Sequence, residues 1–148
     1  ESNTLIQNYE ITKKYNNTIN IKIKKTNFLA KINNNGETFL IGSNGKLTPD
    51  IYQNDSLPYI FGKPDVEEFL NFKRVLDKSK FSYSEIEKLY FFPSKRWDLK
   101  LKSGILVKLS KNFTKESLNS AFNFLENYND GKPTIIDARI NNQIILNE

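Results

Sequence analysis

A predicted β-hairpin at residues 95–109 is the feature that most constrains the fold of this chain. Apolar residues alternate with charged ones on both sides of Ser103-Gly104, and glycine tolerates the positive φ angle that a tight turn requires. Because successive strand side chains point to opposite faces, each strand would have one apolar face and one polar face. The segment therefore predicts an antiparallel pair with one buried face. The apolar positions are Trp97, Leu99 and Leu101 before the turn and Ile105, Val107 and Leu109 after it.

Strict alternation also predicts strands toward both ends of the chain. In residues 18–24 the isoleucines share one face, so Ile19, Ile21 and Ile23 are expected to face a core while the lysines face water. Turns rich in Asn and Gly separate these strands, since both residues adopt positive φ readily. The predicted strands span residues 9–15, 18–24, 28–32, 38–41, 134–140 and 143–146.

Two segments between the strands carry helix signals. Asp65 followed by Glu68 has the spacing of a capping box, and Thr114 can cap a helix whose apolar residues recur at helical spacing. Residues 82–85 repeat the capping pattern before a short helix or turn, and residues 57–62 form an apolar connector. The chain is therefore predicted to be an α+β protein, a mostly antiparallel β-sheet with two or three helices packed on one side.

The amino-acid composition excludes most catalytic chemistry. The chain has no His and no Cys, which removes thiol nucleophiles, imidazole acid–base catalysis and Cys/His metal sites. Asp98 is isolated in the sequence, and Asp137 lies two residues from Arg139 on one strand face, which predicts a structural ion pair. The glycines of residues 42–45 lack the Lys-Ser/Thr and the helix of a phosphate loop. We predict a protein that is not an enzyme, with no catalytic residue, cofactor or metal site.

The basic charge of the chain does not predict a nucleic-acid partner. The formal net charge is +5, but most lysines lie on the polar side of alternating strands, where they solvate a face and protect sheet edges. No segment approaches the ~20 apolar residues of a membrane span. The sequence does not begin with Met, so we expect an excised part of a longer protein, with any anchor before residue 1.

Several motifs, taken in order, resemble the extracytoplasmic region of the bacterial cell division proteins FtsQ and DivIB. Residues 15–24 resemble the last strand of the family's POTRA domain, with Asn16 in place of the usual proline. Residues 28–31 and 36–45 resemble the entry into its β domain and a following hairpin. The other matching motifs are the Leu-Pro-hydrophobic-hydrophobic-x-Gly connector at 57–62, the Arg-Trp-x-Leu-x-Leu hairpin at 95–109 and the terminal Val-Asp-Leu-Arg strand at 136–139.

This resemblance implies a domain organisation, a location and a function. Residues 1–26 would be the carboxyl-terminal remnant of a POTRA domain and residues 27–148 the FtsQ-type β domain. The full-length protein would be a single-pass membrane protein on the periplasmic side of the inner membrane, at the division septum. The domain would bind FtsB, together with FtsL, by strand addition at its terminal sheet edge, and would so link and regulate septal cell-wall synthesis.

The resemblance also places the partner-binding residues. Arg139 matches the basic residue that pairs with an acidic residue of the partner, and Ile140 occupies a position that is often aromatic in the family. Asn141, Asn142 and Gln143 match the edge segment that receives the added strand. Lys95 or Arg96 matches a second basic contact, and the alignment allows either residue.

Two other functions remain open at this point. A different POTRA-linked envelope scaffold, handling outer-membrane proteins, would also act by strand addition. A basic domain that binds nucleic acid or another anionic polymer would show steeply salt-dependent binding instead.

Overall fold

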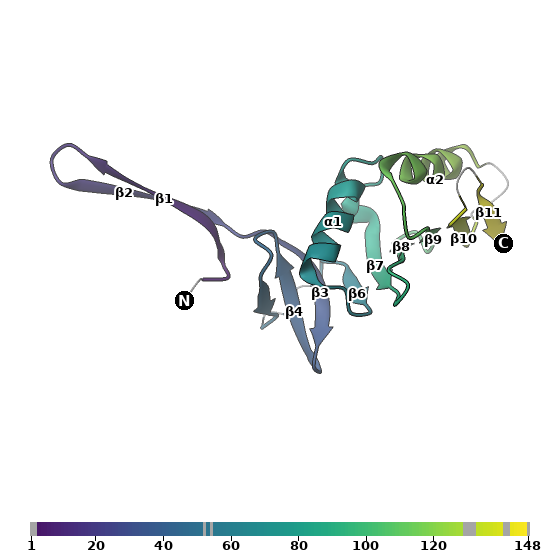
Figure 1. The fold of residues 1–148 in the computed structure, drawn as a ribbon, viewed down its shortest axis with the longest axis horizontal. Helices are drawn as coiled ribbons and strands as arrows, with labels where there is room; N and C mark the ends of the chain where they lie inside the picture. The colour runs from purple at the N-terminus through teal and green to yellow at the C-terminus, as the bar shows by residue number, and fades with distance from the viewer. Residues whose placement is uncertain (1–2, 52, 54, 129–132, 141–142, 148) are drawn as a thin grey trace. The chain divides into compact units, whose positions relative to one another are not determined.

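The computed structural model describes residues 3–51, 53, 55–128, 133–140 and 143–147, and divides the chain into two compact units, Glu1–Leu57 and Pro58–Glu148 (Figure 1). The described residues form two α-helices, one short 3₁₀ helix and strands that pair mostly in antiparallel fashion. This confirms the predicted α+β class.

The amino-terminal unit consists of strands and turns. β1 (Ile6–Lys14) pairs only with β2 (Thr18–Lys25). The next three strands pair with one another in antiparallel fashion, in the order β3 (Phe28–Asn34), β4 (Glu37–Gly42) and β5 (Leu47–Pro49). Asn35 and Gly36 have φ angles of 54° and 91°, as a two-residue hairpin turn requires. β5 was not predicted from the sequence.

The expectation that the β2 isoleucines face a core is wrong for this chain. Ile19, Ile21 and Ile23 are 58–61% exposed, although they do share one face as predicted. The reason is that β1 and β2 pair only with each other, so in the described part of the chain no second layer covers their apolar face. An isolated two-stranded hairpin has no further strands or helices that could cover one of its faces.

The carboxyl-terminal unit has a mixed sheet with the strand order β11-β10-β9-β8-β7-β6. Two of its pairs are parallel, β6 with β7 and β9 with β10, and each is bridged by a helix as parallel neighbours require. The elements are β6 (Tyr59–Phe61), α1 (Val66–Asp77), the 3₁₀ helix η1 (Tyr83–Glu85), β7 (Ile86–Phe91), β8 (Trp97–Leu101), β9 (Leu106–Leu109), α2 (Lys115–Asn127), β10 (Ile135–Ala138) and β11 (Ile145–Asn147).

Both helices pack on one face of this sheet, above the strands in Figure 1. Trp97 is 3% exposed and its ring lies 4.5 Å from that of Phe72 on α1 and 4.8 Å from that of Phe91 on β7. Leu99 and Val107, paired across β8 and β9, are fully buried on the same face. The predicted hairpin and the core position of its tryptophan are confirmed.

The helix ends follow the predicted caps, with one exception. Asp65 and Glu68 form both bonds of a capping box, and Thr114 caps α2 together with Ser117. The Ser82 side chain makes no capping bond and lies 2.7 Å from the hydroxyl of Ser84 instead. Residues 57–62, expected to be a connector, contain β6, because their short apolar run completes the parallel pair with β7.

A search of the described residues for a helix that could cross a bilayer found none, since neither α1 nor α2 has the length and hydropathy.

Candidate partner-binding edge

The sheet of the carboxyl-terminal unit ends at a short strand, β11. Ile145 of β11 lies opposite Asp137 of β10, and Leu146 lies opposite Ile136. In the described part of the chain β11 has a strand neighbour on one side only, and Ile145 is 50% exposed. Such an edge carries outward-facing N–H and C=O groups that another strand can satisfy.

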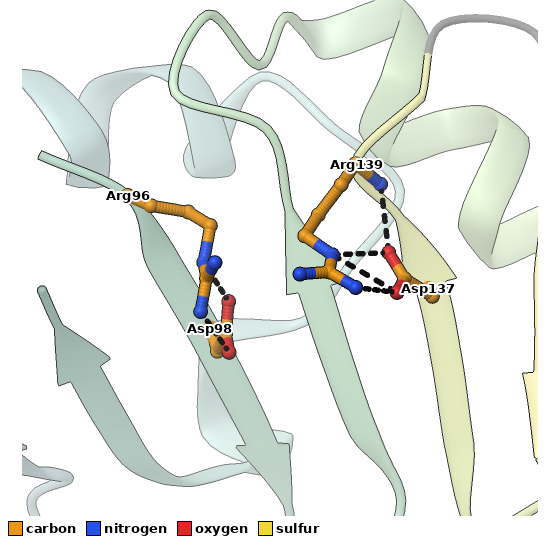
Figure 2. A network of polar contacts seen from close by, with 4 residues as sticks. All are labelled: Arg96, Asp98, Asp137 and Arg139. Atoms are coloured by element: carbon orange, nitrogen blue, oxygen red, sulfur yellow. Dashed lines mark hydrogen bonds and ion pairs between the residues drawn. The ribbon is translucent and has the colours of Figure 1, made fainter. Parts of the chain in front are cut away.

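Arg139, the first predicted site residue, lies just after β10 and is held by Asp137 (Figure 2). Its Nε donates to both carboxylate oxygens at 2.8 and 2.9 Å, its Nη2 donates to Oδ2 at 2.5 Å, and its backbone N–H donates to Oδ1 at 3.1 Å. The predicted ion pair is confirmed. These bonds hold the pKa of Asp137 below its usual range and raise the pKa of Arg139 further. The arginine side chain stays 45% exposed.

Arg96, the second candidate basic residue, pairs with Asp98 through longer side-chain contacts (Figure 2). Its Nε lies 3.2 Å from Oδ1 of Asp98, and its guanidinium carbon lies 4.2 Å above the ring of Phe92. Asp98 is only 3% exposed, and this burial raises the pKa of the carboxyl, although Arg96 acts in the opposite direction. Burial outweighs the arginine here because removing a carboxylate from water disfavours its charged form.

The two aspartate–arginine pairs occupy one row of the open sheet face. The register places Lys108 of β9 opposite Asp98 on one side and opposite Asp137 on the other. Opposite charges on neighbouring strands stabilise a sheet, so the row holds both arginines on one surface. The structure thus brings Arg96 and Arg139 to the same face of the sheet.

Lys95 does not join this row. It occupies a tight turn with a φ angle of 61°, and its ammonium lies 2.8 Å from the Glu68 carboxylate at the start of α1. That ion pair raises the pKa of Lys95. Of the two candidates for the second basic contact, Arg96 therefore lies in the row of Arg139 and Lys95 lies beside a helix.

Ile140 and Gln143 lie beside a cavity of about 530 Å³, and Ile140 is 53% exposed. The backbone N–H of Gln143 donates to the Ile140 carbonyl at 3.2 Å. Asn141 and Asn142, also predicted site residues, lie outside the described residues. The other lining residues come from the start of α2 and the end of β10: Asn112, Thr114, Glu116, Ser117, Ser120, Ala138 and Ile144.

Among the described residues no cluster of three or more carboxylates could hold a metal ion. The described part of the site presents the exposed Arg139 guanidinium, the exposed Ile140 and an open strand edge, which are groups that can bind a polypeptide.

A comparison with models of protein families identifies the family of this chain. The family model described as cell division protein FtsQ/DivIB, C-terminal, matches residues 23–139, which is well over half of the chain. The chain belongs to the FtsQ/DivIB family. This assigns the FtsQ/DivIB chain to bacterial cell division, within a family of division proteins that are not enzymes. Residue Arg139 is the last residue of the match, so the matched region ends where the candidate edge begins.

One solved structure similar to this FtsQ/DivIB chain is the major extracytoplasmic domain of the trans isomer of the bacterial cell division protein DivIB from Geobacillus stearothermophilus. The two sequences are 14% identical, the TM-score is 0.44, and the similarity covers 66% of this chain and 85% of the other. No curated protein matches the sequence.

Sequence reasoning missed two parts of the site. The cavity beside Ile140 depends on where α2 begins relative to β10, which no local pattern contains. The burial of Asp98 had a partial signal, because Arg96-x-Asp98 repeats the i, i+2 spacing of Asp137-x-Arg139 on a polar strand face. Asp98 lies on an inner strand, between Tyr90 of β7 and Lys108 of β9.

Proposed function

We propose that this chain is a non-catalytic interaction module of the bacterial division machinery that binds FtsB, together with FtsL, by strand addition at β11. The module acts on the periplasmic side of the inner membrane at the septum, and links and regulates septal cell-wall synthesis. The observation that carries the proposal is the one-sided pairing of β11 next to an exposed, oriented Arg139.

The geometry of Arg139 supports recognition of an acidic partner residue. Asp137 occupies Nε and Nη2, and within the described residues Nη1 makes no hydrogen bond. A guanidinium held in this way presents its remaining donors in a fixed direction, which favours a second carboxylate. A charge pair at such a rim contributes mostly to register and to the association rate.

A charge-swap experiment tests this contact. Arg139→Glu should weaken binding of a peptide from the FtsB of the same organism by about tenfold or more, as measured by calorimetry. Exchanging one acidic residue of that peptide for Lys should restore affinity for the Arg139→Glu protein. Lys24→Glu changes the net charge equally on the other unit and serves as the control. Binding that is equal in all of these combinations would contradict the proposal.

Strand addition itself is tested with proline substitutions at Ile145 and Leu146. Consecutive residues of a strand direct their backbone groups to opposite edges, so one of the two substitutions removes an outward-facing N–H and the other a bond to β10. The outward substitution should abolish peptide binding and leave the near-ultraviolet circular dichroism of the protein unchanged. If both variants bind the peptide as wild type does, the edge is not the site.

We further propose that residues 1–26 form the end of a POTRA-type domain in a longer, membrane-anchored protein. The exposed Ile19, Ile21 and Ile23 support this proposal, because an apolar face of this kind is stable when another layer covers it. In a longer version that includes the upstream coding sequence, amide hydrogens of β1 and β2 should exchange at least about tenfold more slowly than in the 148-residue chain. Equal exchange in the two chains would contradict this assignment.

A further inference from the structure

An apolar groove lies at the opposite end of α2 from the candidate edge. It has a volume of about 380 Å³, enough for one large side chain, and its walls come from the segment before β7, the end of the β8–β9 hairpin and the last turns of α2. Phe81 and Phe122 meet edge to face there, with ring centroids 5.3 Å apart. The apolar lining consists of Phe81, Leu101, Ile105, Phe122 and Leu125.

Two carboxylates, Glu85 and Glu126, lie at the rim of this groove. Both are exposed, and neither forms an ion pair within the part of the chain that the structure describes. Lys80 also lies at the rim, where its ammonium donates to the neutral side chain of Asn123 at 2.7 Å. With two carboxylates and one ammonium, the rim has a net negative charge in a protein whose formal net charge is +5.

Glu126 also lies at an unfavourable position in its helix. It belongs to the last turn of α2, which contains no basic residue, and the carboxyl end of a helix carries a partial negative charge. By contrast α1 has Arg74 in its last turn. A cation bound beside Glu126 would therefore interact favourably with both the carboxylate and the end of the helix.

We propose that this groove binds a protein segment that inserts one large apolar side chain between Phe122 and Leu125 and places an adjacent Lys or Arg against Glu85 and Glu126. The apolar lining selects the anchor, and the charge of the rim selects its neighbour. The groove uses no residue of the β11 edge, so this proposal stands independently of the binding of FtsB.

Three short peptides test the proposal on the isotope-labelled 148-residue chain. Acetylated and amidated Gly-Lys-Phe-Lys-Gly should shift the NMR signals of Phe81, Phe122 and Leu125 in a saturable way. The Glu-flanked peptide Gly-Glu-Phe-Glu-Gly and the anchor-free peptide Gly-Lys-Ala-Lys-Gly should each bind at least about fivefold more weakly. Raising the salt to about 1 M should reduce the difference between the Lys- and Glu-flanked peptides, because it screens exposed charges.

Matched variants separate the two parts of the groove. The double variant Glu85→Gln, Glu126→Gln should remove the preference for Lys over Glu flanks and retain binding of the Phe anchor. Leu125→Arg should abolish binding of the Lys-flanked peptide, whereas Glu116→Gln, at the other end of α2, should leave it unchanged. Urea unfolding of each variant shows whether it is folded, and Leu125→Ser replaces Leu125→Arg if the latter is not.

Four results with the peptides would overturn the proposal, and a fifth without any peptide would do so too. The four are the absence of saturable shifts, equal affinity for Lys and Glu flanks, a preference that survives the double glutamine variant, and shifts that map to β11 or to the β1–β2 hairpin. Concentration-dependent shifts of the groove residues without any peptide would identify a second copy of this chain as the occupant instead, and would also overturn it.

Discussion

At the scale of single residues, two aspartates with the same local pattern have opposite pKa shifts. Asp137 and Asp98 each bond an arginine two residues away on the same strand face. The Arg139 hydrogen bonds lower the pKa of Asp137, whereas burial raises the pKa of Asp98 despite Arg96. The difference is in depth, because the Asp137 side chain is 14% exposed and that of Asp98 is 4% exposed.

The first consequence is a pH-dependent contribution of Asp137 to stability. A carboxyl whose pKa is lower in the folded than in the unfolded state stabilises the fold above the unfolded value, ~3.9, and this stability is lost as the pH falls through the folded pKa. Asp137→Asn should reduce the free energy of unfolding at pH 7 by less than about 1 kcal/mol, since solvent screens the exposed arginine. Urea unfolding should show that the difference from wild type shrinks as the pH falls below the unfolded value.

Asp98 should show the opposite trend. Its pKa is higher in the folded state, so the folded protein holds the proton more tightly and stability falls as the pH rises from the unfolded value through the folded one. Relative to Asp98→Asn, which cannot ionise, wild type should therefore lose free energy of unfolding over that pH range. The two asparagine variants, measured in one pH series, control for each other. If the stability differences from wild type change with pH in the same direction for both variants, burial does not determine the sign of the pKa shift.

At the scale of secondary-structure elements, backbone geometry explains why the 57–62 motif ends in glycine. Gly62 has a φ angle of 105°, and a Cβ atom built there would lie 2.2 Å from the Phe91 carbonyl oxygen, at the end of β7. Gly104 has a similar φ of 90° with no atom within 4 Å of its Cβ position. Gly104→Ala should cost about 1–2 kcal/mol from backbone strain alone, and Gly62→Ala a further 1–3 kcal/mol, about the cost of overpacking. Equal losses in urea unfolding would contradict the close approach.

Helix caps give a second prediction at this scale. Asp65→Ala removes the side chain that accepts from the Glu68 backbone N–H at 2.7 Å, and should lower the free energy of unfolding by about 1 kcal/mol. Ser82→Ala is the matched control, because the Ser82 side chain makes no capping bond, and its effect should stay within about 0.5 kcal/mol. An equal loss in the two variants, measured by thermal unfolding, would show that the capping box contributes nothing.

The elements show which parts of the fold a sequence can predict. The 95–109 hairpin and both capped helices were predictable because alternation, helical spacing and caps are local signals. The parallel pairing of β6 with β7 was not, since a run of three residues carries no information about its distant partner. The same distinction applies to the site. Arg139 and Asp137 are two residues apart, so their pairing could be predicted from the sequence. The cavity beside Ile140 could not, because it depends on the position of the distant helix α2.

At the scale of the whole molecule, burial is distributed unevenly between the two units. The largest fully buried side chains come almost entirely from the carboxyl-terminal unit, with Ile41 as the exception. The residues of β2 are all exposed, and β1 is exposed from Asn8 onward. Since buried apolar area supplies most of the stability of a fold, the hairpin depends on its backbone hydrogen bonds and cross-strand pairs. Local stability should therefore differ between the two parts of one chain.

Hydrogen exchange tests this difference directly. Amides of β1 and β2 should exchange through local opening that costs little free energy, because an isolated two-stranded hairpin is marginally stable in water. Amides of β8 and β9, next to fully buried Leu99 and Val107, should exchange only through global unfolding. The free energy of opening measured at these amides should therefore fall with urea as steeply as the free energy of global unfolding does. Ile21→Thr should accordingly leave the urea midpoint of the whole chain unchanged, whereas Val107→Thr should lower it. Equal protection of the two strand pairs would mean that the exposed isoleucine face is covered in solution, and a second copy of the chain would then be detected by sedimentation.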